Sequence, residues 1–162
     1  MSRPATARLL DRLRTALPIV QAPMAGVQGS AMAVAVCEAG GLGALPAAML
    51  APEALRRELA AIRAQTTRPF NVNFFCHASP PADAAQEAAW RAALAPYYRE
   101  FGIDAATIAA GPGRRAGGAE EAARRAEFEP PVVSFHFGLP PPALLDQVRL
   151  WGATVMASAT TV

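Results

Sequence analysis

Short apolar runs that alternate with turns and amphipathic segments constrain the fold of this 162-residue chain more than any other feature. Each run is too short for an ordinary helix, and the segments between the runs are rich in Ala, Arg and Glu. The runs are Pro18–Met24, Leu42–Pro46, Pro69–Phe75, Pro131–Phe137 and Thr154–Ala159. Strands that alternate with helices predict a parallel sheet of right-handed βαβ units. The nearly continuous apolar character of the runs predicts that both faces of this sheet are covered.

This pattern fits two α/β architectures, an open doubly wound sheet or part of a TIM-barrel type (β/α)8 fold. A dinucleotide-binding sheet carries a Gly-x-Gly-x-x-Gly turn after its first strand, and no such turn follows Pro18–Met24. The missing turn weakens the dinucleotide-binding version. A chain of 162 residues allows one domain and leaves no room for a second of ordinary size.

Capping residues and glycine stops predict where the helices begin and end. Ser30 is a predicted N-cap for a helix over Ala31–Ala39, which Gly40 ends. Further predicted helices span Pro52–Ala64, Ala82–Phe101 with a kink at Pro96, Ala119–Glu127, and Pro141–Leu150 with Gly152 as its stop. The glycine-rich stretch Gly111–Gly118 follows no strand, which favours a flexible loop over a phosphate-binding turn.

Charge and cysteine content exclude several classes of protein. The formal net charge is +2, and the arginines alternate with Glu and Ala instead of clustering as they do in nucleic-acid binders. Cys37 and Cys76 are too few for a disulfide framework and fit a reducing cytoplasm. The uncharged stretch Thr15–Cys37 contains prolines, glycines and glutamines that a lipid-facing helix would not readily accept. We therefore expect a soluble cytoplasmic protein that binds neither nucleic acid nor a membrane.

Five motifs, in the same order and at suitable spacing, resemble those of the nitronate monooxygenase (2-nitropropane dioxygenase) family. They are Pro18–Gly26, Glu38–Gly43, Arg68–Asn73, Val132–Pro140 and Ala157–Thr161. The resemblance implies an FMN-dependent TIM barrel that oxidises alkyl nitronates, with the flavin reduced by substrate and reoxidised by molecular oxygen. The nitronate and oxygen are then the expected small-molecule partners.

In such a barrel, ligands lie at the carboxyl ends of the strands. The resemblance places Ala22, Pro23 and Met24 in a first-strand segment that lines the flavin with backbone groups. It matches Asn73 to a flavin-contacting asparagine. It matches Ser158 to a position where some relatives have a lysine near the flavin. We expect these five residues to bind the cofactor.

His136 follows the fourth run and is the predicted substrate-pocket residue, where a neutral imidazole could bind the nitro group. The alternative is a strand histidine that only hydrogen-bonds within the barrel.

No metal site is expected, because Cys76 and His77 are adjacent on a strand and point to opposite faces. We expect Cys37 to be a small buried apolar residue, and nothing near Cys76 would obviously lower the pKa of its thiol.

The chain departs from the family in its length. A (β/α)8 barrel typically needs about 250 residues, and no Glu-x-x-Gly-His motif, which carries the family's catalytic histidine, is present. The resemblance implies that this histidine lies beyond Val162, the last residue of the sequence. We therefore expect residues 1–162 to be the N-terminal part of an FMN-dependent TIM-barrel domain, with about five strands and no catalytic base among them.

An unclosed barrel of this kind exposes a sheet edge, which predicts marginal stability or self-association. Two alternatives to a nitronate-oxidising enzyme stay open at this point. One is a related FMN-dependent enoyl-thioester reductase, and the other is a non-catalytic truncated fragment.

Overall fold

A computed structural model describes residues 4–77, 81, 83–108 and 128–160 of the chain. The chain divides into two compact units, one of residues 1–77 and 114–162 and the other of residues 78–113. The predicted Gly111–Gly118 loop and Ala119–Glu127 helix lie outside the described residues, and so does Val162, beyond which the family's catalytic histidine is expected.

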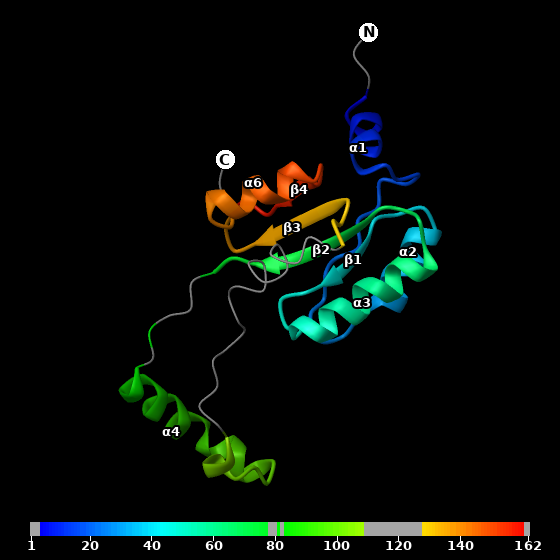
Figure 1. The fold of residues 1–162 in the computed structure, drawn as a ribbon. Coiled ribbons are helices and arrows are strands. Elements are labelled where there is room, and N and C mark those ends of the chain that lie inside the picture. The colour runs from blue at the N-terminus through cyan, green and yellow to red at the C-terminus, as the bar shows by residue number, and fades with distance from the viewer. Residues whose placement is uncertain (1–3, 78–80, 82, 109–127, 161–162) are drawn as a thin grey trace. The chain divides into compact units, whose positions relative to one another are not determined.

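A parallel sheet forms the centre of the larger unit (Figure 1). Within the described ranges it has four strands, β1 (Gly43–Pro46), β2 (Phe70–Phe75), β3 (Val132–His136) and β4 (Thr154–Ala157). Their order in the sheet is β1-β2-β3-β4, the same as their order in the chain. A sequential order is the arrangement of a (β/α)8 barrel, whereas a doubly wound sheet reverses direction at a switch point. The fold is therefore α/β of the barrel type.

Four of the five predicted strands are confirmed, and the first run is not a full strand. Pro18–Met24 pairs with the chain before β1 through a single parallel bridge between Val20 and Leu42. The amide of Leu42 donates to the Ile19 carbonyl at 2.8 Å, and the amide of Gln21 donates to the Leu42 carbonyl at 2.9 Å. Prolines at both ends of this run lack an N–H donor, which limits the ladder it can form.

The helices of the larger unit follow the predicted segments closely. They are α1 (Ala5–Leu13), which the sequence pattern did not predict, α2 (Ser30–Glu38), α3 (Pro52–Gln65) and α6 (Pro142–Leu150). Gly40 and Gly152 follow α2 and α6 with φ angles of +97° and +83°, so they act as the predicted stops. Among the described residues, no helix is both long enough and apolar enough to cross a membrane.

The predicted capping role of Ser30 is wrong. Gly29 is the N-cap of α2, and Ser30 is the first residue of the helix. The amide of Ser30 donates to Oε2 of Glu58 on α3 at 2.6 Å. A carboxylate from a neighbouring helix thus satisfies a free amide at the start of α2, so Ser30 does not need to cap it.

Alternation along the strands gives the sheet two different faces. One face packs against the helices α2, α3 and α6 in a single apolar core that includes Leu45, Val72 and Phe135. On the opposite face, Leu13 at the end of α1 packs with Leu42, Val132 and Met156. The helices α2, α3 and α6 therefore cover one face, as helices do on the outside of a barrel, and the second face carries the polar residues described below.

The smaller unit contains α4 (Ala84–Glu100) and the short 3₁₀ helix η1 (Ala105–Thr107). Asp83 caps α4 by accepting from the amides of Ala85 and Gln86, so the predicted helix over Ala82–Phe101 is confirmed within two residues at each end. Arg91 ties the two helices together, because its guanidinium binds Glu87 at 2.7 Å and the carbonyl of Ala105 at 3.0 Å. Pro96 lies inside α4, and the kink there stays a prediction.

Candidate functional site

The candidate site lies at the carboxyl ends of the parallel strands. Asn73 lies in β2, His136 ends β3, and Ser158 directly follows β4. The run that contains Ala22–Met24 lies next to the start of β1 through the Val20–Leu42 bridge. Because parallel strands present their carboxyl ends at one edge of the sheet, His136 and Ser158 share this edge, and Asn73 lies two residues before the end of β2.

A buried polar ladder crosses from β2 to β3 on the face opposite the helices. The amide nitrogen Nδ2 of Asn71 donates to Oγ of Ser134 at 2.8 Å, and Nδ2 of Asn73 donates to the same oxygen at 3.0 Å. Nδ2 of Asn73 also lies 3.3 Å from the Ser134 carbonyl oxygen. Asn71 and Asn73 are each 1% exposed. Sequence reasoning selected Asn73 and missed the role of Asn71, although the Asn-x-Asn spacing already put both side chains on one face.

Two side-chain oxygens of this ladder are not paired. Oδ1 of Asn71 and Oδ1 of Asn73 are buried without a hydrogen-bond partner among the described residues. Leaving a buried acceptor unsatisfied costs about 1–3 kcal/mol. Groups of this kind in a folded protein call for an explanation, and a ligand that donates to them is one.

His136 and Ser158, predicted separately as substrate and cofactor residues, lie in contact. Nδ1 of His136 is 2.9 Å from Oγ of Ser158. The imidazole also belongs to a group of rings at the ends of β2 and β3, in which the centroid of Phe75 lies 6.4 Å from that of His136 and 5.0 Å from that of Phe137. Phe137 is 62% exposed and has a φ of +64°. A bulky residue in the left-handed region is strained, and strain of this kind is often found at functional sites.

Two glutamines hold the segment that contains Ala22, Pro23 and Met24 against β1. Oε1 of Gln21 accepts from the amide of Ala44 at 2.9 Å, and Nε2 of Gln21 donates to Oε1 of Gln28 at 2.8 Å. Nε2 of Gln28 completes the loop by donating to the Ala44 carbonyl at 3.0 Å. Ala22 and Met24 remain exposed between these anchors. Sequence reasoning missed both glutamines, because their partners are backbone groups of another segment.

The two thiols are not activated. Cys37 is fully buried, as predicted, and its Sγ lies 3.3 Å from the Pro69 carbonyl oxygen. Burial raises the pKa of Cys37, and burial also raises the pKa of Cys76. Both groups are therefore protonated at neutral pH and poor nucleophiles. Within the described part of the chain, no three His, Cys, Asp or Glu side chains are grouped as metal ligands.

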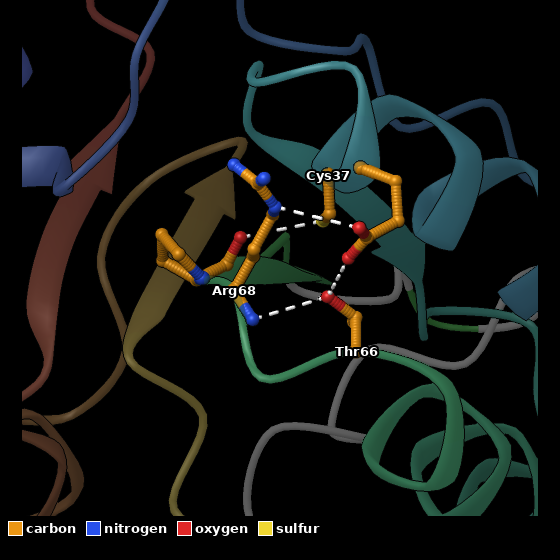
Figure 2. A network of polar contacts seen from close by, with 5 residues as sticks. Cys37, Thr66 and Arg68 are labelled. Carbon is orange, nitrogen blue, oxygen red and sulfur yellow. Dashed lines mark hydrogen bonds and ion pairs between the residues drawn. The ribbon is translucent and has the colours of Figure 1, made fainter.

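The opposite, amino end of the sheet carries a polar network between α2 and the start of β2 (Figure 2). Oγ1 of Thr66 donates to Oε1 of Glu38 at 2.5 Å and accepts from the amide of Arg68 at 3.0 Å. Nε of Arg68 lies 3.5 Å from Oε2 of Glu38. A hollow of about 530 Å³ lies at the same end, lined by residues that include Arg14, Arg63 and Arg68. None of the predicted site residues lines this hollow, and in barrels this end of the strands serves stability.

Comparison with known proteins agrees with the family resemblance of the sequence motifs. The family model described as Nitronate monooxygenase matches residues 6–162. A nitronate monooxygenase from Paraburkholderia phytofirmans is 39% identical over 95% of this chain and 42% of its own length. One from Pseudomonas aeruginosa is 38% identical over 89% of this chain and 41% of its own length. The chain therefore spans about two fifths of the length of these curated relatives.

Solved structures share the fold of this chain. A nitroalkane oxidase from Streptomyces ansochromogenes superposes with a TM-score of 0.79 at 36% identity, covering 94% of this chain and 42% of its own. FabK from Thermotoga maritima superposes with a TM-score of 0.61 at 22% identity, covering 93% of this chain and 36% of its own. At that identity the likeness to FabK describes the fold alone.

Proposed function

Because this chain belongs to the nitronate monooxygenase family, an oxidoreductase family, we propose that it takes part in the FMN-dependent oxidation of alkyl nitronates by molecular oxygen. The observation that carries the proposal is the buried ladder of Asn71, Asn73 and Ser134, with two acceptor oxygens that have no partner in the described chain. The ladder lies in β2 and β3, next to the contact of His136 with Ser158 at the ends of β3 and β4.

The residues present fit an FMN group. The ring of a flavin offers an N–H donor and carbonyl acceptors, and Asn73 offers it a buried oxygen that lacks a donor. Ala22, Pro23 and Met24 would line the ring with backbone groups, and Ser158 would add a hydroxyl. When bound, FMN would take electrons from the nitronate and pass them to oxygen. These residues would bind and orient it.

His136 is proposed to bind substrate. Its Nδ1 is engaged by Ser158. If the Ser158 hydroxyl donates to Nδ1, the proton of a neutral imidazole lies on Nε2, and Nε2 can then donate to an oxygen of the nitronate. An alkyl nitronate is already deprotonated, so this step requires no base. We therefore assign no catalytic base between Met1 and Val162.

A flavin-binding experiment on the 162-residue protein tests the proposal. After incubation with FMN and desalting, we expect a retained visible flavin band, which an alkyl nitronate bleaches under anaerobic conditions. Oxygen uptake should follow on aeration, and the neutral parent nitroalkane, which still carries its proton, is the matched control. A colourless protein would instead assign the chain to the non-catalytic fragment alternative. Oxidation of NADH with an enoyl thioester, and no reaction with nitronate, would assign it to the reductase alternative.

We also propose that the free edge of the sheet pairs with a second copy of the chain. Among the described strands β4 is last in the order, and its residues Thr154, Val155 and Met156 are only half-buried. An unpaired edge of this kind is a template for another strand. Light scattering should then give a mass that rises with protein concentration, whereas a monomer at all concentrations would contradict the pairing.

Cys37 and Cys76 are both free thiols, which supports the proposal of a cytoplasmic location.

A further inference from the structure

We propose that Ser134, supported by Asn71, is a positioning residue that fixes the amide of Asn73 with its oxygen, not its nitrogen, toward the ligand. This inference rests on the proposed function, because it specifies how one flavin-binding residue is oriented. It predicts the chemistry of the contact: the ligand must present an N–H or O–H donor to Asn73.

The register of the sheet brings the three side chains together. Asn73 lies directly opposite Ser134 in the β2–β3 pair, and Asn71 lies opposite Val132, two residues earlier. Residues two apart on a strand point to the same face. The Ser134 hydroxyl therefore lies between the two amides, 2.8 Å from Nδ2 of Asn71 and 3.0 Å from Nδ2 of Asn73.

The main-chain carbonyl of Ser134 decides which way the Asn73 amide faces. A carbonyl oxygen only accepts hydrogen bonds, so the group 3.3 Å from it must be the NH₂ end of Asn73. Turning the amide over would place Oδ1 against this carbonyl and lose the bond. Nδ2 of Asn73 is thus held by two oxygens of one residue, and Oδ1 is left as a pure acceptor.

Asn71 reinforces this arrangement. Its Nδ2 occupies a second lone pair of the Ser134 hydroxyl, so that oxygen accepts from both amides at once. Ser134 is 5% exposed, which removes competition from water. The cost of this arrangement is visible in the two unpaired buried oxygens. A ladder that served only the stability of the sheet would gain nothing from leaving them unpaired, whereas a ladder that presents an acceptor to a ligand requires one.

The oxidised flavin ring has an N–H donor on its pyrimidine half, so it meets the requirement that Asn73 sets. The same requirement excludes ligand groups that carry only acceptors, such as a phosphate dianion, from contact with Oδ1 of Asn73. The phosphate of FMN must therefore be bound elsewhere.

The test separates orientation from binding. Protein labelled with ¹⁵N in asparagine reports the side-chain NH₂ of Asn73 without flavin, and a fluorescence titration reports FMN affinity. Ser134→Ala should accelerate exchange of the Asn73 amide protons with water about tenfold and weaken FMN binding about tenfold, since it removes one of the two acceptors of that NH₂. Ser134→Thr keeps the hydroxyl and should restore both. Thr154→Val, which removes a hydroxyl at the start of β4, is the matched control and should change neither.

The outcomes distinguish the positioning role of Ser134 from the proposed function of the chain. Unchanged amide exchange in Ser134→Ala overturns the positioning role, and so does faster exchange with unchanged FMN affinity. If the wild-type chain binds no FMN but Ser134→Ala still releases the amide, the orientation stands and the proposed function fails. If FMN binds and Ser134→Ala changes nothing, the function stands and this inference fails.

Discussion

The two ends of the parallel sheet are built differently. At the amino end, the Thr66 hydroxyl both donates to Glu38 and accepts from the amide of Arg68, in a network that joins α2 to the start of β2. Toward the carboxyl end, the buried side-chain oxygen of Asn73 lacks a partner among the described residues, and Phe137, which follows β3, is exposed in a strained backbone conformation. Stability and ligand binding place opposite demands on polar groups, because stability requires partners within the protein and binding requires groups left for the ligand. The difference supports the proposal that the carboxyl end binds the ligand while the amino end maintains the fold.

The largest expected effect is on stability, at the contact between α2 and β1. A Cβ on Gly43 would lie 2.0 Å from the carbonyl oxygen of Ala33, a backbone atom that cannot move alone. We expect Gly43→Ala to lower the free energy of unfolding by about 3 kcal/mol or more. Urea denaturation followed by circular dichroism measures it. Ala35→Ser, on the exposed side of α2, should stay within about 0.5 kcal/mol of wild type, and equal stability of the two variants would contradict the close packing.

Asn73→Asp should weaken FMN binding at the carboxyl end of the sheet. The carboxylate has the same shape, but it has no N–H to donate and repels the Ser134 carbonyl that Nδ2 now faces at 3.3 Å. We expect FMN affinity to fall about thirtyfold, which corresponds to about 2 kcal/mol. Fluorescence titration at neutral pH measures this loss. Binding equal to wild type would show that Asn73 does not contact the cofactor.

Thr66→Val, at the amino end of the sheet, should lower stability and leave FMN affinity unchanged. The change keeps the shape of the side chain but removes the hydroxyl that links Glu38 to the Arg68 amide. The expected loss of stability is about 1 kcal/mol, with FMN affinity unchanged. Running the same titration on Thr66→Val and Asn73→Asp separates the two ends. A large affinity loss in Thr66→Val would remove the distinction between them.

The smallest effect concerns the carboxylate that holds the start of α2. Hydrogen bonds from the side chain and the backbone amide of Ser30 lower the pKa of Glu58. A lowered folded-state pKa stabilises the protein above the ordinary pKa of a glutamate, and this stabilisation is lost as the pH falls through the lowered value. Because solvent screens this partly exposed carboxylate, Glu58→Gln should cost only about 0.5 kcal/mol near pH 7.

The same difference should shrink in acid, where the wild-type Glu58 is protonated. Unfolding curves of wild type and Glu58→Gln over a series of pH values from neutral into acid measure this convergence. A stability gap that stays the same across the whole series would mean that the charge of Glu58 plays no part in holding Ser30.

Several elements could be predicted because their causes are local. The apolar runs around Leu45, Val72 and Val133 became strands, since a short apolar run flanked by turns and too short for an ordinary helix favours a strand. Gly40 and Gly152 ended their helices as predicted, because few other residues adopt a positive φ readily. Ser30 was misassigned because the group that satisfies its amide, Glu58, comes from 28 residues away.

The site was predicted less completely, for a related reason. Asn73 was identified by its resemblance to a family motif, but its orientation depends on the register between β2 and β3, which a single sequence does not state. The contact between His136 and Ser158 likewise requires two strands to be neighbours. The glutamine pair that anchors Ala22–Met24 binds backbone groups of Ala44, which carry no mark in the sequence.

The alternation of strands and helices, the family, and the strand-end residues within motifs could all be obtained from the amino-acid sequence alone. These follow from periodicity, turn chemistry and motif spacing, which act over a few residues. The three-dimensional packing was needed to show that one serine accepts from two asparagines, that their oxygens have no partner among the described residues, and that the two ends of the sheet differ. Hydrogen bonds between strands depend on which residues the register places opposite each other, and register is set by the packing of the whole sheet.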